Sequence, residues 1–193
     1  MDEFLELGPA APHGDPAGRV GLRVLLVPAP AGEFGPEPRH GQRLHRAAGA
    51  GDRPHLAPLR SLPPHPDVIP ALGRLRDADY RLFTLMNSSK AVVAEQMTHA
   101  KLSDFFEALL SVEDVGKYKP HADVYRWAAG RVGADVSECL FVATHGWDVA
   151  GAAWAGMRTA FVARPGQQMF PLGPAIDITV LSLAELEGEL DRM

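Results

Sequence analysis

The sequence predicts an α/β fold in which a parallel sheet is covered by helices on both faces. Apolar, strand-like runs alternate with helix-compatible stretches from residue 67 to residue 190. Cys139–Val142 is continuously apolar, as expected of a strand that is buried on both faces. Polar residues follow the strand-like runs, which is typical of loops at the C-terminal edge of such a sheet. A chain of 193 residues with this alternation fits a single domain.

The expected elements follow one another closely along the chain. Apolar residues at helical spacing, with Asp67 as the N-cap, predict the first helix. We expect helices over 67–76, 102–109, 120–131, 149–155 and 183–190, and a further one that Ser88 or Ser89 caps and that ends near residue 100. We expect strands over 80–85, 110–112, 139–142, 157–163 and 178–181. This order of strands and helices requires parallel pairing with crossover helices.

The N-terminal third differs from the rest of the chain. Residues 1–60 hold nine of the 17 prolines and nine of the 19 glycines, with seven arginines and no lysine. The sequence therefore predicts an irregular Pro/Gly/Arg-rich segment over 1–58 and an α/β core over 59–193. Two interpretations stay open for the segment. One is a flexible, disordered leader, and the other, which we favour, is a stretch outside the ancestral reading frame of a GC-rich gene.

Composition limits the classes of partner. A net charge of −5 and a pI near 5.9 give no reason to expect nucleic acid or an anionic membrane as a partner. The chain has no run of about 18 apolar residues and no signal peptide, so we expect no membrane association. The single cysteine, Cys139, fits a reducing cytoplasm. The histidines match no zinc spacing, and we expect no metal site.

Three polar loops follow predicted strands and should converge on one edge of the sheet. The first is Asn87-Ser88-Ser89, which is suited equally to binding an anion at a helix N-terminus and to capping that helix. The second contains Lys119, just before a helix that opens with proline and carries Tyr125. The third, 144–148, ends in Asp148, a carboxylate that a nearby lysine would keep ionised as a general base or orienting group.

These motifs together resemble the haloacid dehalogenase superfamily, and within it the type II 2-haloacid dehalogenases. The likeness rests on the strand that ends in Asn-Ser, on KPHADVY at 119–125 and on HGWDVAGA at 145–152, and it extends from about residue 59 to residue 190. The resemblance implies a Rossmann-like core with a small helical cap inserted after the first strand. It also implies hydrolysis of the carbon–halogen bond of 2-haloalkanoic acids through an aspartyl ester, without a cofactor.

The resemblance also implies roles for individual residues. Lys119 resembles the lysine that supports the nucleophile, Tyr125 the tyrosine of the same helix, and Asp148 the acid that helps to activate water. We assign catalysis to these three. We assign substrate or halide binding to the polar and aromatic residues of the flanking loops, Asn87, Ser88, Thr144, His145 and Trp147. The implied partners are a small carboxylate substrate and a second copy of the chain in a homodimer.

The sequence departs from the family pattern in three places. Met86 stands where a serine or threonine is usual, and Ala143-Thr144-His145 stands where many members have Ser-x-Asn. No Asp-x-x-x-Thr-Leu follows a strand before residue 59, so no nucleophile is found. Val20–Val27 is the one run able to fill the first-strand slot, and it would place Pro28 or Ala29 near the nucleophile's position.

Three functions therefore compete. The first is a dehalogenase-type hydrolase that is inactive or crippled because its nucleophilic aspartate is missing. The second is a non-catalytic relative that binds a small anion or a protein partner. The third is a phosphatase-type relative, which would need a magnesium site made by the first-strand aspartate and usually a second acidic residue near Asp148.

Overall fold

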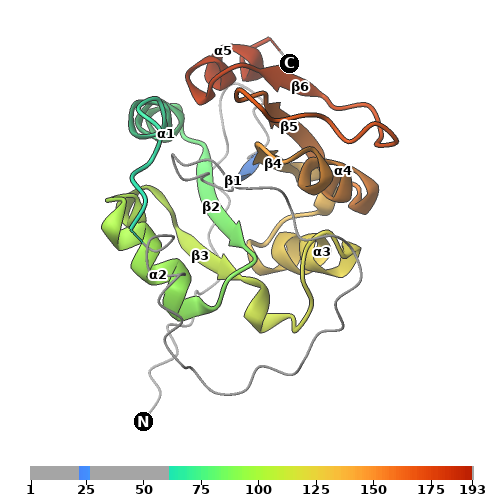
Figure 1. Ribbon diagram of the computed structural model, residues 1–193, viewed down its shortest axis with the longest axis horizontal. Coiled ribbons are helices and arrows are strands. Elements are labelled where there is room, and N and C mark those ends of the chain that lie inside the picture. Colours follow the sequence, from blue (N-terminus) through green and yellow to red (C-terminus); the bar gives the residue numbers. More distant parts are fainter. Residues whose placement is uncertain (1–21, 27–60, 193) are drawn as a thin grey trace.

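Five parallel pairings build a six-stranded sheet in the computed structural model, which describes residues 22–26 and 61–192 (Figure 1). The strand order is β3-β2-β1-β4-β5-β6. The strands are β1 Arg23–Leu26, β2 Arg81–Met86, β3 Ala108–Ser111, β4 Cys139–Ala143, β5 Arg158–Val162 and β6 Ile178–Val180. All neighbouring strands run in the same direction, so their C-terminal ends share one edge. The predicted parallel sheet is confirmed.

Strand β1 occupies the middle of the sheet between β2 and β4. Leu26 pairs with Thr84 on one side and with Val142 on the other. Val24 and Leu25 have no exposed surface, so this four-residue strand is part of the core. The prediction that Val20–Val27 supplies the first strand is confirmed for the residues that the structure describes.

Helices cover both faces of the sheet, as the alternation of elements predicted (Figure 1). The helices are α1 Val68–Asp77, α2 Lys90–His99, α3 Ala122–Arg131, α4 Gly146–Ala155 and α5 Leu186–Leu190. Successive residues of a strand point to opposite faces. Leu25 and Phe141 therefore pack with α3 and α4, whereas Val24 and Leu140 pack with α1, α2 and α5. Each face of the sheet therefore has its own apolar core.

The structure corrects three local predictions. The helix expected at 102–109 is a single 3-10 turn, Ser103–Phe105, and strand β3 already begins at Ala108. Helix α4 begins at Gly146, three residues before the predicted start, so Asp148 lies in its first turn. Asp67 stands at the N-cap of α1, but its side chain makes no capping bond there.

Several predictions concern residues outside the described part of the chain. They are the irregular 1–58 segment, the helical cap and the placement of Pro28 or Ala29. Within residues 22–26 and 61–192, no helix is long and apolar enough to cross a membrane.

Candidate active site

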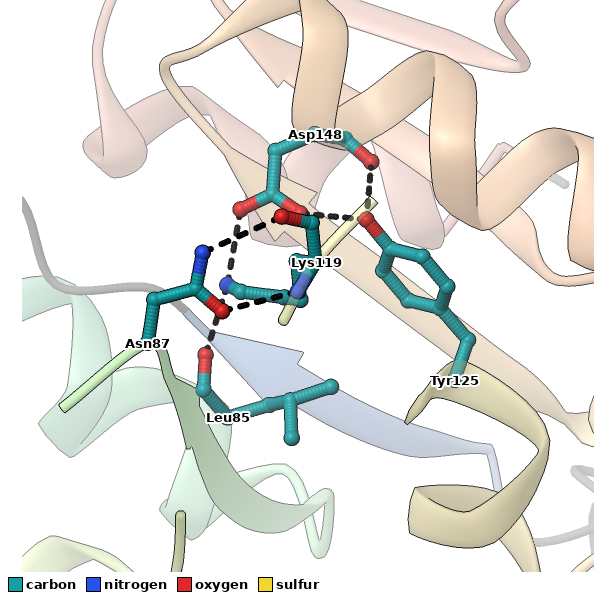
Figure 2. A network of polar contacts seen from close by, with 5 residues as sticks. All are labelled: Leu85, Asn87, Lys119, Tyr125 and Asp148. Atoms are coloured by element: carbon teal, nitrogen blue, oxygen red, sulfur yellow. Dashed lines mark hydrogen bonds and ion pairs between the residues drawn. The ribbon is translucent and has the colours of Figure 1, made fainter. Parts of the chain in front are cut away.

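The centre of the site is a buried ion pair between Lys119 and Asp148 (Figure 2). Lys119 lies in the loop before α3, and Asp148 lies in the first turn of α4, just beyond the C-terminal end of β4. Lys119 Nζ is 2.7 Å from Asp148 Oδ2, and the two side chains are 1% and 2% exposed. The predicted convergence of these two loops is therefore present in the structure.

The Lys119 ammonium has further partners inside the core. It donates to the main-chain oxygen of Leu85 at 2.8 Å and lies 5.2 Å from the centroid of the Phe141 ring. Burial lowers the pKa of Lys119, and the charge and hydrogen bond of Asp148 oppose that effect. Asp148 and the cation–π contact with Phe141 are therefore what favour the charged form of a lysine in an apolar surrounding.

Tyr125 completes the centre from the second turn of α3. Its hydroxyl donates to Asp148 Oδ1 at 2.6 Å and lies 3.1 Å from the main-chain oxygen of Asp148. Burial, together with the negative charge of Asp148, raises the pKa of Tyr125 far above its ordinary value. Tyr125 therefore remains a proton donor to the carboxylate. Gly151 makes this approach sterically available, since a Cβ there would stand 2.7 Å from the Tyr125 hydroxyl oxygen.

Asn87 reaches the same loop and bonds to its main chain. Its Oδ1 accepts from the Lys119 N–H at 2.9 Å, and its Nδ2 donates to the Lys119 carbonyl oxygen at 3.2 Å. Ser88 lies beside it, and the Ser88 carbonyl accepts from the Ser111 hydroxyl. The structure thus brings Asn87 to the site, in contact with the backbone of the catalytic loop.

The N-terminus of α2 is used internally. Ser89 makes no side-chain capping bond, contrary to the capping prediction. Glu113, from the turn after β3, accepts instead from the Lys90 N–H at 2.8 Å. The Glu113 carboxylate therefore occupies the N-terminus of α2, which was one of the two predicted sites of anion binding or capping.

The remaining predicted site residues lie at the edge of this centre or away from it. Thr144 is buried on the α1 face, where it lines a small cavity of about 20 Å³ together with Arg164. A cavity of that size holds about one water molecule. The rings of His145 and Trp147 lie 5.8 Å apart at 30°. Among the described residues, no acceptor faces the buried Nε1 of Trp147.

Three groups that contact the site were not predicted from the sequence. They are the Leu85 carbonyl, the Phe141 ring and the Glu113 carboxylate. A main-chain carbonyl leaves no signal in a sequence, and Phe141 looks like any core residue of an apolar strand. Glu113 lies in a charged loop, and its partner is the backbone of a distant helix.

The acid groups do not form a metal centre in the described part of the chain. No three His, Cys, Asp or Glu side chains there are grouped so as to hold an ion. Both oxygens of Asp148 already accept hydrogen bonds, from Lys119 and from Tyr125. The pair Lys119–Asp148 is suited to acid–base work on a bound molecule or water.

Comparison with known proteins agrees with this geometry. Residues 44–156 match the family of haloacid dehalogenase-like hydrolases. The chain belongs to this family. The matched span leaves out β1 but includes Lys119, Tyr125 and Asp148. The predicted superfamily is thereby confirmed.

Individual relatives of this haloacid dehalogenase-like hydrolase point to the dehalogenase branch. The chain is 36% identical over 122 residues to an (S)-2-haloacid dehalogenase from a Pseudomonas species, covering 63% of this chain and 53% of the relative. The chain spans about half the length of the curated relatives that it matches.

Solved structures share the fold. The L-2-haloacid dehalogenase of Xanthobacter autotrophicus, with chloropropionic acid covalently bound, superposes with a TM-score of 0.67 at 27% identity, covering 74% of this chain and 69% of that one. A phosphatase of the superfamily from Thermococcus onnurineus gives a TM-score of 0.59 at 27% identity, covering 66% of this chain and 58% of that one.

Proposed function

We propose that the chain carries the water-activating half of a hydrolase of the 2-haloacid dehalogenase type, and that its substrate class is short 2-haloalkanoic acids. In the sequence as it stands the reaction stops, because no aspartate follows the first strand to attack the substrate. The proposal rests on one observation, the buried Lys119–Asp148 pair with Tyr125 bonded to the same carboxylate. Burying two charges is costly, and buried groups with a perturbed pKa, such as Lys119, whose pKa burial lowers, cluster at functional sites.

The proposed reaction has two steps. A carboxylate attacks the halogen-bearing carbon of the substrate, the carbon–halogen bond breaks, halide leaves and an ester forms. A water molecule then gives a proton to Asp148 as its oxygen adds to the carbonyl carbon of that ester. The ester C–O bond breaks, Asp148 returns the proton to the leaving oxygen of the 2-hydroxy acid, and the carboxyl group that is freed loses its proton to solvent. Each oxygen of Asp148 keeps a lone-pair direction beyond its bond to Lys119 or Tyr125, so a water can still donate to it.

Lys119 and Tyr125 have supporting roles in this scheme. The ammonium of Lys119 is placed to balance negative charge on Asp148 and on an attacking carboxylate beside it. Tyr125 holds Asp148 in one orientation through its hydroxyl. His145 and Trp147 are the residues that we propose for the walls of the substrate site.

The inference that the nucleophile is missing comes from the amino-acid sequence. Strand β1 is described up to Leu26, and Val27-Pro28-Ala29 follows it. None of these three residues has a carboxylate. The same positions therefore offer a direct test, because they directly follow the central strand in the sequence.

The test measures halide release from 2-chloropropionate in the presence of EDTA. We expect no turnover by the unaltered chain. Among Val27→Asp, Pro28→Asp and Ala29→Asp, we expect one to release halide, and we expect the corresponding asparagine variants to release none. Addition of Asp148→Ala to the active variant should abolish the release. Turnover by the unaltered chain that is lost in Asp148→Ala would contradict the claim that the nucleophile is missing.

Two other functions are less well supported. A phosphatase-type reaction would require a second acidic residue beside Asp148 to hold a magnesium ion, and no three His, Cys, Asp or Glu side chains among the described residues are grouped in that way. Magnesium-dependent hydrolysis of p-nitrophenyl phosphate would favour it. A non-catalytic carboxylate-binding protein would bind 2-chloropropionate and stay inactive in all three aspartate variants. The buried, unpaired Cys139 supports a cytoplasmic location, and the homodimer stays a prediction.

A further inference from the structure

Helix α4 carries a glycine one turn after Asp148, on the side that meets α3. Gly151 follows Asp148 by three residues, and residues at that spacing lie on the same face of a helix. We propose that Gly151 is a positioning residue, which sets how closely the segment from Lys119 to Tyr125 approaches Asp148. This role rests on the proposed function, in which these three side chains form the water-activating group.

Gly151 is in contact with both ends of the segment from Lys119 to Tyr125. A Cβ at Gly151 would stand 2.7 Å from the Cβ of Pro120, which directly follows Lys119. The same Cβ would stand 2.7 Å from the hydroxyl oxygen of Tyr125 and 3.2 Å from its Cε2. Real Cβ atoms do not approach other heavy atoms as closely as 2.7 Å, so only glycine fits the observed spacing of the two helices.

Neither neighbour of Gly151 can give way without moving a group that bonds to Asp148. The ring of Pro120 closes onto the main-chain nitrogen, so a displacement of Pro120 is passed to Lys119, whose Nζ lies 2.7 Å from Asp148 Oδ2. Tyr125 has no exposed surface, and its hydroxyl donates to Asp148 Oδ1 at 2.6 Å (Figure 2). A side chain at position 151 would therefore lengthen one or both of these contacts.

Two other helical glycines provide matched controls for the effect on stability. A Cβ at Gly73 in α1 or at Gly130 in α3 would meet no heavy atom within 4 Å apart from adjoining residues of its own helix. Glycine inside a helix ordinarily costs stability relative to alanine. We therefore expect Gly73→Ala and Gly130→Ala to raise the melting temperature, and Gly151→Ala to lower it.

The pKa of Lys119 distinguishes positioning from packing and requires no turnover. Lys119 is buried and the other three lysines of the chain are exposed, so a pH titration of the ε carbons in ¹³C-lysine-labelled protein separates it from them. Burial lowers the pKa of Lys119, and the charge of Asp148 opposes that effect. We expect a lower pKa of Lys119 in Gly151→Ala than in the parent protein, because the counterion is farther away, and no change in Gly130→Ala.

Tyr125→Phe guards against a Gly151→Ala protein that does not fold. It removes the hydroxyl oxygen that a Cβ at position 151 would meet, so Gly151→Ala in this background displaces chiefly Pro120. Because Pro120 directly follows Lys119, the pKa of Lys119 should be lower in the double variant than in Tyr125→Phe alone. An equal pKa in these two folded proteins would overturn the proposal, whatever the change in melting temperature.

The catalytic consequence is measured in the introduced-aspartate variant that releases halide. Gly151→Ala should reduce its kcat roughly a hundredfold with little change in KM, since a misplacement of about 1 Å in catalytic groups can cost that much. Gly130→Ala should leave kcat unchanged. A Gly151→Ala protein that folds and keeps the parent kcat would contradict the positioning role. If no aspartate variant releases halide, the proposed function fails, and the pKa comparison still decides the role of Gly151.

Discussion

Two ion pairs lie at the C-terminal edge of the sheet, on its opposite faces, and they differ in what surrounds them. Lys119–Asp148, on the α3/α4 face, is 1% and 2% exposed. Arg164–Asp67, on the α1 face, is 15% and 16% exposed. Asp67 accepts from Arg164 Nη2 at 2.9 Å with both oxygens, and it accepts from the Leu183 N–H at 2.8 Å.

The difference indicates separate tasks for the two pairs. Asp67 joins the start of α1, the end of β5 and the turn that begins α5, so its bonds close the fold around three segments. Asp148 joins α4 to Lys119 and Tyr125, which lie at the start of α3, so its bonds link two neighbouring elements on one face of the sheet. Burial of two charges costs stability, so we expect a fully buried pair that links only neighbouring elements to serve chemistry as well.

Breaking the buried pair should have the largest effect. Asp148→Asn leaves the Lys119 charge without a counterion in the core, and we expect it to lower the free energy of unfolding by about 3–5 kcal/mol. The double variant Lys119→Met/Asp148→Leu removes both charges and should recover most of that loss. Urea unfolding of the three proteins checks this. A double variant as unstable as Asp148→Asn would contradict the view that the pair costs stability.

The stability of Asp148→Asn has a predictable pH dependence. Burial lowers the pKa of Lys119, and loss of Asp148 removes the group that opposes this effect. Between the lowered pKa and the ordinary lysine pKa, the folded state binds fewer protons than the unfolded state, so stability rises with pH. The deficit of Asp148→Asn should therefore be largest at low pH and shrink toward alkaline pH.

The two pairs also show what a sequence can predict. The meeting of Lys119, Tyr125 and Asp148 could be predicted because they lie in two short motifs, one at the start of α3 and one directly after β4. Asp67 was interpreted as a helix cap, since its partner Arg164 is 97 residues away and leaves no local signal. The expected helix over 102–109 failed for a related reason. Its apolar pattern suits a helix, but pairing with β2 makes Ala108–Ser111 a strand.

Breaking the second pair should have an intermediate effect. Burial raises the pKa of Asp67, but the hydrogen bonds from Arg164 and Leu183 and the Arg164 charge outweigh it, so the pKa lies below its ordinary value. A lowered carboxyl pKa stabilises the fold above the unfolded-state pKa, and this contribution is lost as pH falls through the folded-state pKa. We expect Asp67→Asn to cost about 1–2 kcal/mol at neutral pH. Thermal unfolding from pH 7 to pH 3 should show the two proteins converging, and a constant difference would argue against the assignment.

The smallest loss of stability is expected for an exposed ion pair at the opposite, N-terminal edge of the sheet. Arg81, at the start of β2, meets Glu107 through two guanidinium nitrogens, with side chains 35% and 45% exposed. Solvent screens such a pair, so Glu107→Gln should cost less than about 1 kcal/mol. The difference in the free energy of unfolding between Glu107→Gln and the parent protein should disappear in 1 M salt, where the screening length falls to about 3 Å. The Asp148→Asn deficit should persist in the same salt, because side chains that are 1% and 2% exposed are not screened by dissolved ions. Equal salt sensitivity of the two deficits would mean that bulk solvent screens the Lys119 site, which would contradict the burial of the pair.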